Sequence, residues 1–282
     1  MKLNSLMREI KSIIHSILFK ARDSYTLNYV IALHLYKHLP RLFSSITLPG
    51  SIRLYINDHA TLSINVPDMY ERKEYFLYKD FIPSKGWIVA DIGAYIGLFS
   101  LYASKNVSND GLIISFEPNP LSYYWLVNNI KLNKTKNTIA LPLALGNTLN
   151  EMHLYVAKEN IGASSFIMDH ITQNPAGKYT IAAEFIVPMI TFDYFLKNSE
   201  KLIGRDIKIL DLVKIDVEGY ELKVLEGAKN ALKQQIVKRF VIEVHKDQVS
   251  TEEIISYLKN YGFHIAGINS DRIKDIVYAK LK

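Results

Sequence analysis

Residues 87–120, WIVADIGAYIGLFSLYASKNVSNDGLIISFEPNP, carry the pattern that indicates how this chain folds. An apolar run stops at Asp91 and Gly93, a helix-like segment follows, and a second apolar run ends on Glu117. This order predicts a β-α-β unit with a ligand site at the carboxyl ends of its strands. Glu117 follows Gly97 by 20 residues, where an acidic side chain can accept both hydroxyls of a ribose. The stretch therefore predicts a nucleoside-binding half-domain.

The spacing of the glycines indicates which nucleoside cofactor this half-domain binds. A dinucleotide loop needs G-x-G-x-x-G, but here Asp91 and Ile96 stand at two of the three glycine positions. A carboxylate at the strand tip would repel a pyrophosphate and suits a ligand with an ammonium or sulfonium. S-adenosylmethionine offers a ribose for Glu117 and a cationic methionine end for the Asp91 region. Alternatively, Gly93 and Gly97 only permit close helix–strand packing and Glu117 is solvated, but the joint spacing favours a cofactor site.

Composition limits the class of protein. The 282 residues suffice for one large α/β domain with an appendage, and 49% hydrophobic and 22% charged residues are typical of a globular chain. The absence of cysteine excludes disulfides and thiolate metal sites and fits a reducing, cytoplasmic location. The net charge of +6 suits an acidic substrate or a membrane surface. Because the basic residues are dispersed, we expect no nucleic acid partner. We also expect neither a spanning helix nor a signal peptide.

The chain is expected to have three parts. Residues 1–50 form a helical N-terminal extension, in which 1–47 either dock on the domain or lie as a basic amphipathic helix on an anionic membrane. Such a helix would make the protein peripherally membrane-associated. Residues 51–86 contain a hairpin over 51–66 and a helix over 70–81. Residues 87–282 form the main domain, with an insertion at 148–190 that is typical of a lid or binding loop.

The main domain alternates strands and helices, which predicts a Rossmann-like α/β fold. Ser250 and Glu253 predict a capping box at the start of one helix. The expected architecture is a mostly parallel seven-stranded sheet closed by a C-terminal antiparallel hairpin. Beyond residue 120, the expected helices span 120–133, 191–197, 220–228 and 250–261, and the expected strands span 139–145, 210–215, 240–244, 263–268 and 275–281.

With these pieces in order, the chain resembles the FkbM family of S-adenosylmethionine-dependent methyltransferases. The resemblance runs from about residue 70 to 245 and rests on ADIGAYIGLFSL (90–101), ISFEPNP (114–120), KIDVEGYE (214–221) and FVIEVH (240–245). The combination of FEPNP with KIDVEGYE is its most specific part. The resemblance implies a class I methyltransferase fold and O-methylation of a hydroxyl on a sugar, glycolipid or secondary metabolite.

The resemblance also assigns cofactor-binding residues. They are Asp91, Gly93, Ala94, Tyr95 and Gly97 in the loop, Glu117, Pro118 and Asn119 at the ribose, and Ala144 and Leu145 at the adenine. One position departs from the family pattern, because Tyr95 stands where the family often has asparagine. Asparagine adopts left-handed backbone more readily than tyrosine, so the loop conformation is in question there. Tyr95 could instead contact the cofactor or the substrate.

Methyl transfer requires an aligned acceptor oxygen and a group that removes its proton. The candidates at strand ends are Asp216, Glu218, Glu243 and His245. We expect His245 to be the base, because its ordinary pKa of about 6.5 suits proton uptake at neutral pH. Asp216 would orient the hydroxyl or the imidazole, or act as the base itself. Strand alternation would bury Glu243, and a buried carboxylate needs a partner.

Other interpretations of these residues are open. Asp216 could be a helix N-cap, Glu218 and Glu221 first-turn helix charges, and His245 an ordinary loop histidine. Asp216, Glu243 and His245 could also bind a divalent cation that acidifies the hydroxyl, although nothing in their spacing requires a metal. The remaining histidines, His34, His38 and His170 among them, show no ligand spacing and are expected to be solvated.

Three other functions compete with a methyltransferase acting on a small molecule, glycan or glycolipid. A nicotinamide-dependent oxidoreductase conflicts with the missing glycines. A non-catalytic binding module, acting at a membrane or with a protein partner through residues 1–47, conflicts with the complete set of cofactor residues. A nucleic-acid amino-methyltransferase would carry NPPY or DPPY where this chain has DVEG.

Overall fold

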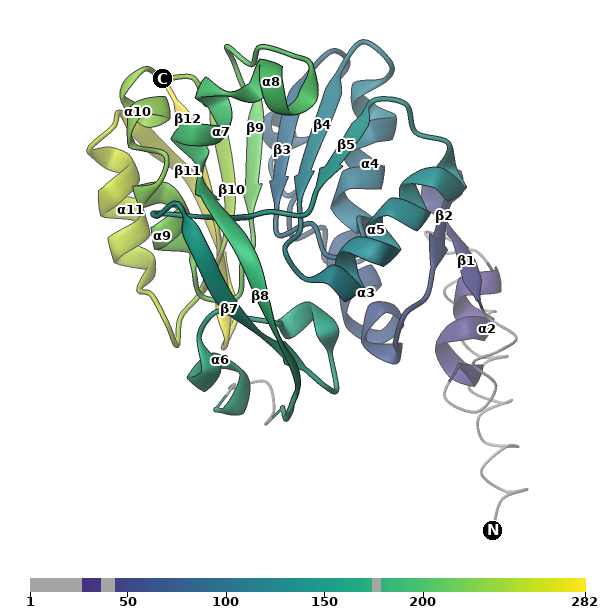
Figure 1. Ribbon diagram of the computed structural model, residues 1–282. Helices are drawn as coiled ribbons and strands as arrows, with labels where there is room; N and C mark the ends of the chain where they lie inside the picture. Colours follow the sequence, from purple (N-terminus) through teal and green to yellow (C-terminus); the bar gives the residue numbers. More distant parts are fainter. Residues whose placement is uncertain (1–26, 37–43, 174–178) are drawn as a thin grey trace. The chain divides into compact units, whose positions relative to one another are not determined.

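The computed structural model describes residues 27–36, 44–173 and 179–282 (Figure 1). The chain divides into two compact units, residues 1–73 with 128–134 and residues 74–127 with 135–282. This division falls between the boundaries expected after residues 50 and 86. Of the helical extension expected over residues 1–50, with its membrane contact through 1–47, residues 1–26 and 37–43 lie outside the described residues. In the described ranges, no helix is long and apolar enough to cross a membrane.

The first unit contains a β-hairpin that begins before the expected one. The hairpin was expected over 51–66, but its first strand lies before residue 51. Strand β2 (Ile52–Tyr55) pairs antiparallel with β1 (Ser45–Leu48), which precedes it, so the boundary expected after residue 50 falls in the turn between these strands. The described helices of this unit are α2 (Leu27–Leu35) and α3 (Val66–Tyr70), with a π-helical turn η3 (Thr61–Asn65) before α3.

The second strand expected in the 51–66 hairpin is wrong, because these residues are helical. The Asp58 carboxylate accepts a hydrogen bond from the backbone N–H of Thr61 at 2.8 Å, which starts a helical turn. Leu62 and Val66 are then one turn apart and both fully buried, whereas Ile64 is 42% exposed. The helix expected over 70–81 is also wrong, since α3 ends at Tyr70.

The second unit is built on a seven-stranded sheet in the order β11-β12-β10-β9-β3-β4-β5. Strand β12 runs antiparallel to β10 and β11, and the other pairs are parallel, which confirms the expected Rossmann-like sheet with its C-terminal hairpin. The strands are β3 (Ile88–Ile92), β4 (Leu112–Phe116), β5 (Thr138–Leu141), β9 (Leu212–Ile215), β10 (Arg239–His245), β11 (Phe263–Ser270) and β12 (Lys274–Leu281).

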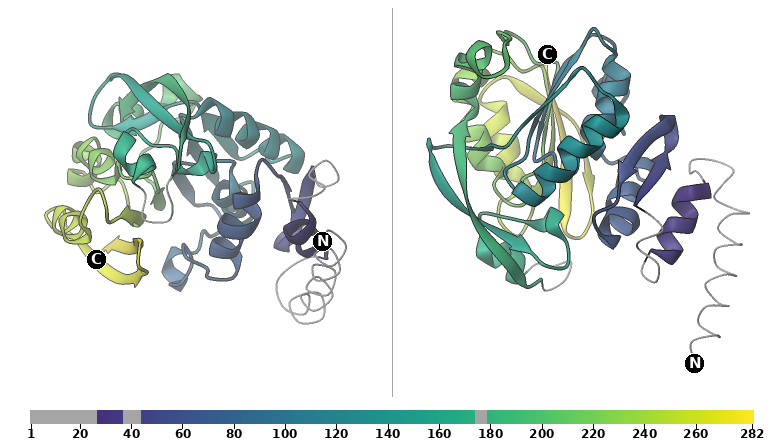
Figure 2. Two further views of the ribbon diagram at one scale, coloured as in Figure 1. Left: turned by 90° about the horizontal axis from the view of Figure 1, so that it is seen from below. Right: turned by 45° about the vertical axis from the view of Figure 1, so that its right-hand side comes forward.

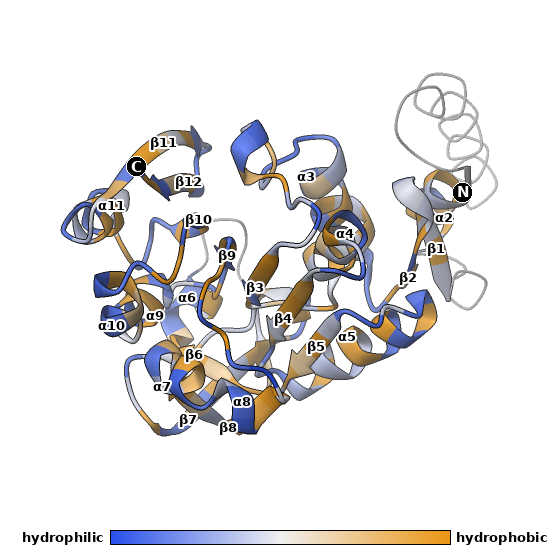
Figure 3. Ribbon diagram, turned by 90° about the horizontal axis from the view of Figure 1, so that it is seen from above, coloured by the Kyte–Doolittle hydropathy of each residue, from blue (hydrophilic) through white to orange (hydrophobic). Residues whose placement is uncertain are grey.

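Helices cover both faces of this sheet (Figure 2). Helix α4 packs on β3 and β4, and α9 and α11 pack from the other side on β10, β11 and β12. The apolar strands of the sheet lie between these layers and form the core (Figure 3). The expected capping box of Ser250 and Glu253 begins α11. The helices are α4 (Leu98–Val107), α5 (Pro120–Asn133), α7 (Phe192–Lys197), α8 (Ser199–Ile203), α9 (Glu221–Glu226), α10 (Lys229–Lys233) and α11 (Thr251–Lys259).

The strand expected over 139–145 is divided between two sheets. Its first part is β5, and its second part is β6 (Ala144–Gly146), which pairs with β8. Pro142 lies between them and has no N–H to continue a ladder. The expected insertion consists of β7 (Asn150–Ala157), α6 (Met168–Thr172) and β8 (Ile181–Thr191), and β7 and β8 form a long antiparallel ribbon.

Candidate functional site

The loop after β3 requires glycine at two positions. Gly93 has a φ of +78°, and a Cβ there would lie 1.8 Å from the backbone carbonyl oxygen of Asp216. Gly97 has a φ of +92°, and a Cβ there would lie 2.6 Å from Cδ1 of Leu126. Only glycine combines left-handed backbone with such close approach. The loop therefore passes directly against the carboxyl end of β9.

Tyr95 keeps the left-handed backbone that its position demands, with a φ of +50°. The replacement of the asparagine typical of the resembled family therefore leaves the loop conformation intact, at the cost of some strain. The preceding residue, Ala94, is buried and donates its N–H to the carbonyl of Phe116 at 3.0 Å. The ring of Tyr95 lies against Gly162 of the insertion, where a Cβ would be 3.3 Å from Cε2 of the tyrosine.

Glu117 lies at the end of β4, where it faces this loop. Its Oε2 accepts the N–H of Tyr95 at 2.7 Å, and its Oε1 accepts the N–H of Asn119 at 2.8 Å. Burial raises the pKa of Glu117 to about 8, although both N–H donors favour the carboxylate. Ribose hydroxyls would add donors to this buried carboxyl group, so the site fits an adenosine ligand.

Asn119 links the same region to a helix and to the insertion. Its Oδ1 caps α5 by accepting the N–H of Leu121 at 3.0 Å, and its Nδ2 donates to Ser164 Oγ at 3.1 Å. Pro118, between Glu117 and Asn119, is half-buried. This segment therefore joins the tip of β4 to residues of the insertion.

Asp91 does not present its carboxylate to a ligand surface, contrary to the expectation from the sequence. It is fully buried, accepts a hydrogen bond from Ser100 Oγ at 2.5 Å and pairs with Lys214 Nζ at 3.4 Å. Burial raises the pKa of Asp91 despite the nearby Lys214 cation. Lys214 also donates to the carbonyl of Gly93 at 2.9 Å. Asp91 therefore stabilises the glycine loop through Lys214.

Asp216 and Glu243 meet at the carboxyl ends of β9 and β10. The hydroxyl of Tyr75 donates to Glu243 Oε2 at 2.7 Å and lies 3.2 Å from Asp216 Oδ2. Lys214 Nζ lies 3.1 Å from the same Asp216 oxygen, and Lys274 Nζ lies 2.9 Å from Glu243 Oε1. Glu243 is thus buried and partnered, as strand alternation predicted. Burial, reinforced by Asp216, raises the pKa of Glu243 to about 7.

His245, the last residue of β10, is buried between carboxylates. Its Nδ1 lies 2.9 Å from Glu221 Oε1, and its Nε2 lies 3.2 Å from Glu218 Oε2. Burial alone would lower the pKa of His245, but Glu218 and Glu221 outweigh it and raise the pKa well above its ordinary value. The two carboxylates favour the protonated ring, which cannot take up a further proton from a substrate. The geometry therefore gives no support to His245 as the base.

The family model for the methyltransferase FkbM domain matches residues 91–265, well over half of the chain. The chain belongs to the FkbM methyltransferase family. This finding confirms the family predicted from the sequence, a methyltransferase with S-adenosylmethionine as its cofactor. The predicted fold agrees with the solved methyltransferase FkbM of Methylobacillus flagellatus KT, which is 14% identical, has a TM-score of 0.50 and matches over 89% of this chain and 60% of that one.

Curated relatives of this FkbM protein carry methyltransferase names. Methyltransferase sdnD of Sordaria araneosa is 28% identical over 67% of this chain and 82% of its own length. Hexuronic acid methyltransferase AglP of Haloferax volcanii is 27% identical over 56% of both chains. The 31-O-demethyl-FK506 methyltransferase FkbM of Streptomyces tacrolimicus is 25% identical over 64% of this chain and 74% of its own length.

His170 lies in the polar cluster of the candidate site, although it was not among the site residues predicted from the sequence. It was expected to be solvated, but it is 1% exposed, and its two ring nitrogens lie 2.7 Å from Asp247 and 2.9 Å from Glu218. Asp247 and Glu218 outweigh the effect of burial and raise the pKa of His170. It lies in the insertion, 48 positions before Glu218, so no local spacing could reveal the contact.

Two further residues of the site were also missed. Lys214 is 3% exposed within the apolar strand β9, and a lysine in a buried strand is a usable sequence signal for a charged partner. Tyr75 offers no such signal, since it lies outside any helix or strand, in a segment that was expected to be helical. Asp216 does not cap a helix, because α9 begins only at Glu221.

The two residues expected at the adenine lie in different hydrophobic clusters. Ala144 packs in the small cluster of the three-stranded sheet with Leu154 and Val187, and Leu145 packs in the main core. Both side chains are at most 3% exposed. The structure therefore does not place these two side chains together on one surface, and an adenine contact from this segment stays a prediction.

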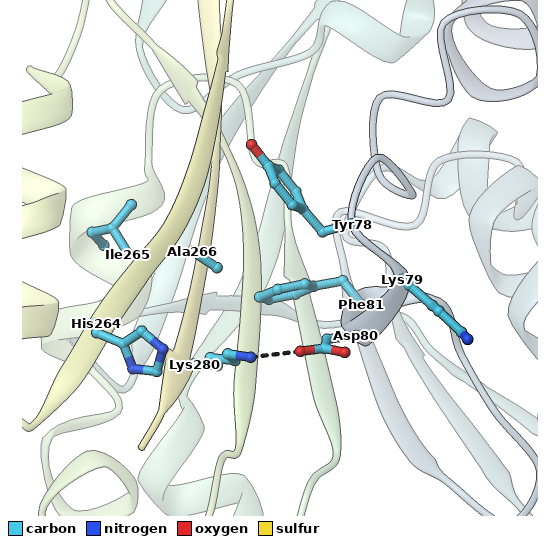
Figure 4. A pocket seen from close by; sticks show the side chains of 8 residues that line it. All are labelled: Tyr78, Lys79, Asp80, Phe81, His264, Ile265, Ala266 and Lys280. Atoms are coloured by element: carbon cyan, nitrogen blue, oxygen red, sulfur yellow. Dashed lines mark hydrogen bonds and ion pairs between the residues drawn. The ribbon is translucent and has the colours of Figure 1, made fainter.

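A pocket of about 530 Å³ lies at the opposite end of the sheet (Figure 4). Its lining includes Tyr78, Phe81, His264 and Lys280. Lys280 pairs in register with Arg239, the first residue of β10, whereas His245 is the last residue of that strand. The pocket is therefore near the amino end of β10, away from Asp216, Glu243 and the glycine loop.

Proposed function

We propose that this FkbM-family methyltransferase methylates a hydroxyl oxygen of a sugar, glycolipid or secondary metabolite at the carboxyl ends of β9 and β10. The observation that carries the proposal is the position of Asp216. Its backbone carbonyl lies against Gly93 of the cofactor loop, and its side chain belongs to the polar cluster of Tyr75, Lys214 and Glu243. Asp216 thus contacts the cofactor loop through its backbone and carries a carboxylate that can remove a proton.

In the proposed reaction, bound S-adenosylmethionine supplies a methyl group, whose bond to sulfur breaks as the acceptor oxygen attacks in line. Asp216 accepts the proton of the acceptor hydroxyl. The hydrogen bond from Tyr75 and the ion pair with Lys214 are both made through Oδ2, which supports Oδ1 as the atom that takes the proton. The ammonium of Lys214 lies 3.1 Å from Asp216 Oδ2, and the pKa of Lys214 is raised by Asp216 and Asp91 despite burial.

Tyr75 and Glu243 position this carboxylate. The Tyr75 hydroxyl bridges the two acids, and Lys274 offsets the charge of Glu243. We assign His245 the role of positioning the neighbouring acids. Its Nε2 lies 3.8 Å from Glu243, and its two nitrogens contact Glu218 and Glu221. Asp216 is thus preferred to His245 as the base.

The names of the relatives support the acceptor class. One relative is named for a hexuronic acid and another for a 31-O-demethyl substrate, which is an oxygen acceptor by name. A sugar acid also suits a chain with a net charge of +6. The non-catalytic alternative, a binding module acting at a membrane or with a protein partner, has no such support from the relatives.

The test is methyl transfer from S-adenosylmethionine with a deuterated methyl group to glucuronic acid and to galacturonic acid, followed by mass spectrometry. We expect a product with one labelled methyl group on a hydroxyl. Asp216→Asn should lower kcat by at least about 100-fold and leave the affinity for S-adenosylhomocysteine within a few-fold of wild type. Exposed Asp206→Asn is the matched control. Equal rates in Asp216→Asn and wild type would remove Asp216 from the role of base, and no product from either acid would remove sugar acids as acceptors.

A further inference from the structure

Three side chains from separate segments converge beside the proposed methyl-transfer site. They are His170 of α6, Glu218 in the turn after β9, and His245 at the end of β10. Glu218 Oε2 lies 2.9 Å from His170 Nε2 and 3.2 Å from His245 Nε2. The three ligand atoms all lie within 4.8 Å of one another. Two imidazole nitrogens thus face the same carboxylate oxygen.

These separations match the ligand spacing around a divalent ion. Nitrogen and oxygen ligands about 2.1 Å from zinc lie about 3.4 Å apart at a tetrahedral angle and about 3.0 Å apart at a right angle. The two distances in the structure, 2.9 and 3.2 Å, fall close to this interval. Both separations from Glu218 to the imidazoles are therefore compatible with an ion held by His170, Glu218 and His245.

The other ring nitrogen of each histidine is held by a carboxylate. Asp247 Oδ2 lies 2.7 Å from His170 Nδ1, and Glu221 Oε1 lies 2.9 Å from His245 Nδ1. Such partners make Nδ1 the N–H donor and direct Nε2 toward a metal, which is the usual second layer around metal-binding histidines. The two rings stand at 88° to each other, with centroids 5.1 Å apart. Asp247 and Glu221 therefore hold the two rings with Nε2 directed toward Glu218.

Glu218 is held in an uncommon conformation at this point. Its φ is +51°, which costs energy for any residue other than glycine. Its backbone carbonyl accepts a hydrogen bond from Ser165 Oγ of the insertion at 2.6 Å. The backbone of the turn thus directs the Glu218 carboxylate between the two rings.

The charge of the neighbouring groups distinguishes this cluster from the metal site considered in the sequence analysis. Asp216, Glu243 and His245 also have ligand atoms within 4.8 Å of one another, but Lys214 and Lys274 already offset those two acids. Within the described part of the chain, no lysine or arginine forms an ion pair with Glu218, Glu221 or Asp247. The three carboxylates around His170 and His245 therefore offer the more negative environment for a cation.

We propose that His170, Glu218 and His245 bind one divalent transition-metal ion, with zinc the ion that fits best. Two imidazoles and one carboxylate are a common zinc ligand set, and they leave a coordination position open. The ion joins the insertion, through His170, to the ends of β9 and β10. This site does not depend on which acceptor the enzyme methylates, so its test can fail independently of the proposed function.

The test is metal binding by the full chain after removal of metals with a chelator. Zinc is titrated in competition with a chromophoric chelator, and we expect one equivalent to bind with submicromolar affinity. His170→Gln should weaken zinc binding by at least 100-fold. Asp247→Asn, which retains all three ligands, should weaken it about 10- to 100-fold. His153→Gln is the matched control, because His153 is an exposed histidine of the same insertion and should bind zinc as wild type does.

A second readout separates metal ligation from a structural effect of the variants. Cobalt(II) bound to the wild type should give the visible absorption of a four- or five-coordinate site, and His170→Gln should lose that absorption. Asp216→Asn should retain it. Failure of the wild type to bind zinc, wild-type affinity in His170→Gln, or loss of cobalt absorption in Asp216→Asn but not in His170→Gln would each overturn the proposal.

Discussion

The buried carboxyl group of Glu117 leads to a pH-dependent prediction for Glu117→Gln. Burial raises its pKa from 4.5 to about 8. In the unfolded chain this group loses its proton near its ordinary pKa, whereas the folded protein holds the proton until about pH 8. Its contribution to stability is therefore fully present below pH 4.5 and is lost as pH rises through about 8.

The magnitude follows from the two pKa values and the local hydrogen bonds. The interval from 4.5 to about 8 corresponds to roughly 4 to 5 kcal/mol at ~1.36 kcal/mol per pKa unit. Glutamine does not titrate, so the variant does not lose this stability as the pH rises. Its NH2 group, however, would face the N–H of Tyr95 or Asn119 and leave that donor unpaired, which costs about 1–3 kcal/mol. Glu117→Gln should thus be the less stable protein near pH 5 and the more stable one near pH 8.

The assay is urea unfolding without ligand between about pH 5 and about pH 8, with exposed Glu252→Gln as the control. The stability curves of wild type and Glu117→Gln should cross within that interval, and Glu252→Gln should follow wild type at every pH. A constant difference between Glu117→Gln and wild type across the interval would refute the argument, because it would show that the Glu117 carboxyl group titrates alike in both states.

Three further substitutions test the packing and charges that position the site. Gly93→Ala places a Cβ 1.8 Å from the Asp216 carbonyl, so we expect a loss of more than about 4 kcal/mol or no folded protein, measured by circular dichroism and urea unfolding. Lys214→Met leaves Asp91 and Asp216 without their buried cation and should cost about 3–5 kcal/mol in the same unfolding assay; a cost below about 1 kcal/mol would contradict the pairing. Ser250→Ala removes the α11 cap and should cost about 1 kcal/mol, a loss that Ser250→Asp should largely avoid.

The fold was largely predictable from the sequence because its signals are local. The apolar runs of β3, β4, β9 and β10 stand between turn residues, and the capping box of α11 is four residues long. The errors arose where one residue overrode a pattern. Asp58 started a helical turn in a segment that alternates like a strand, and Pro142 divided an apolar run between two sheets.

The candidate site was predictable only in part. Glu243 was expected to be buried with a partner, and the structure supplies Tyr75 and Lys274 as partners. The roles of Asp91 and His170 depend on contacts between distant segments. The Asp91 side chain turns into the sheet toward Lys214, and His170 reaches the site only because α6 packs at the carboxyl ends of β9 and β10. Spacing along the chain carries no information on such contacts.

Calorimetric titration of S-adenosylhomocysteine into wild type and Glu117→Ala tests the central claim, a nucleoside cofactor held by the β3 loop and Glu117. We expect micromolar binding to wild type, on the order of −8 kcal/mol, and no binding of NAD. Glu117→Ala, which loses the carboxylate that would accept the ribose hydroxyls, should bind at least about 100-fold more weakly. Glu252→Ala should bind as wild type does. Equal affinities for wild type and Glu117→Ala, or no binding to wild type, would contradict the account.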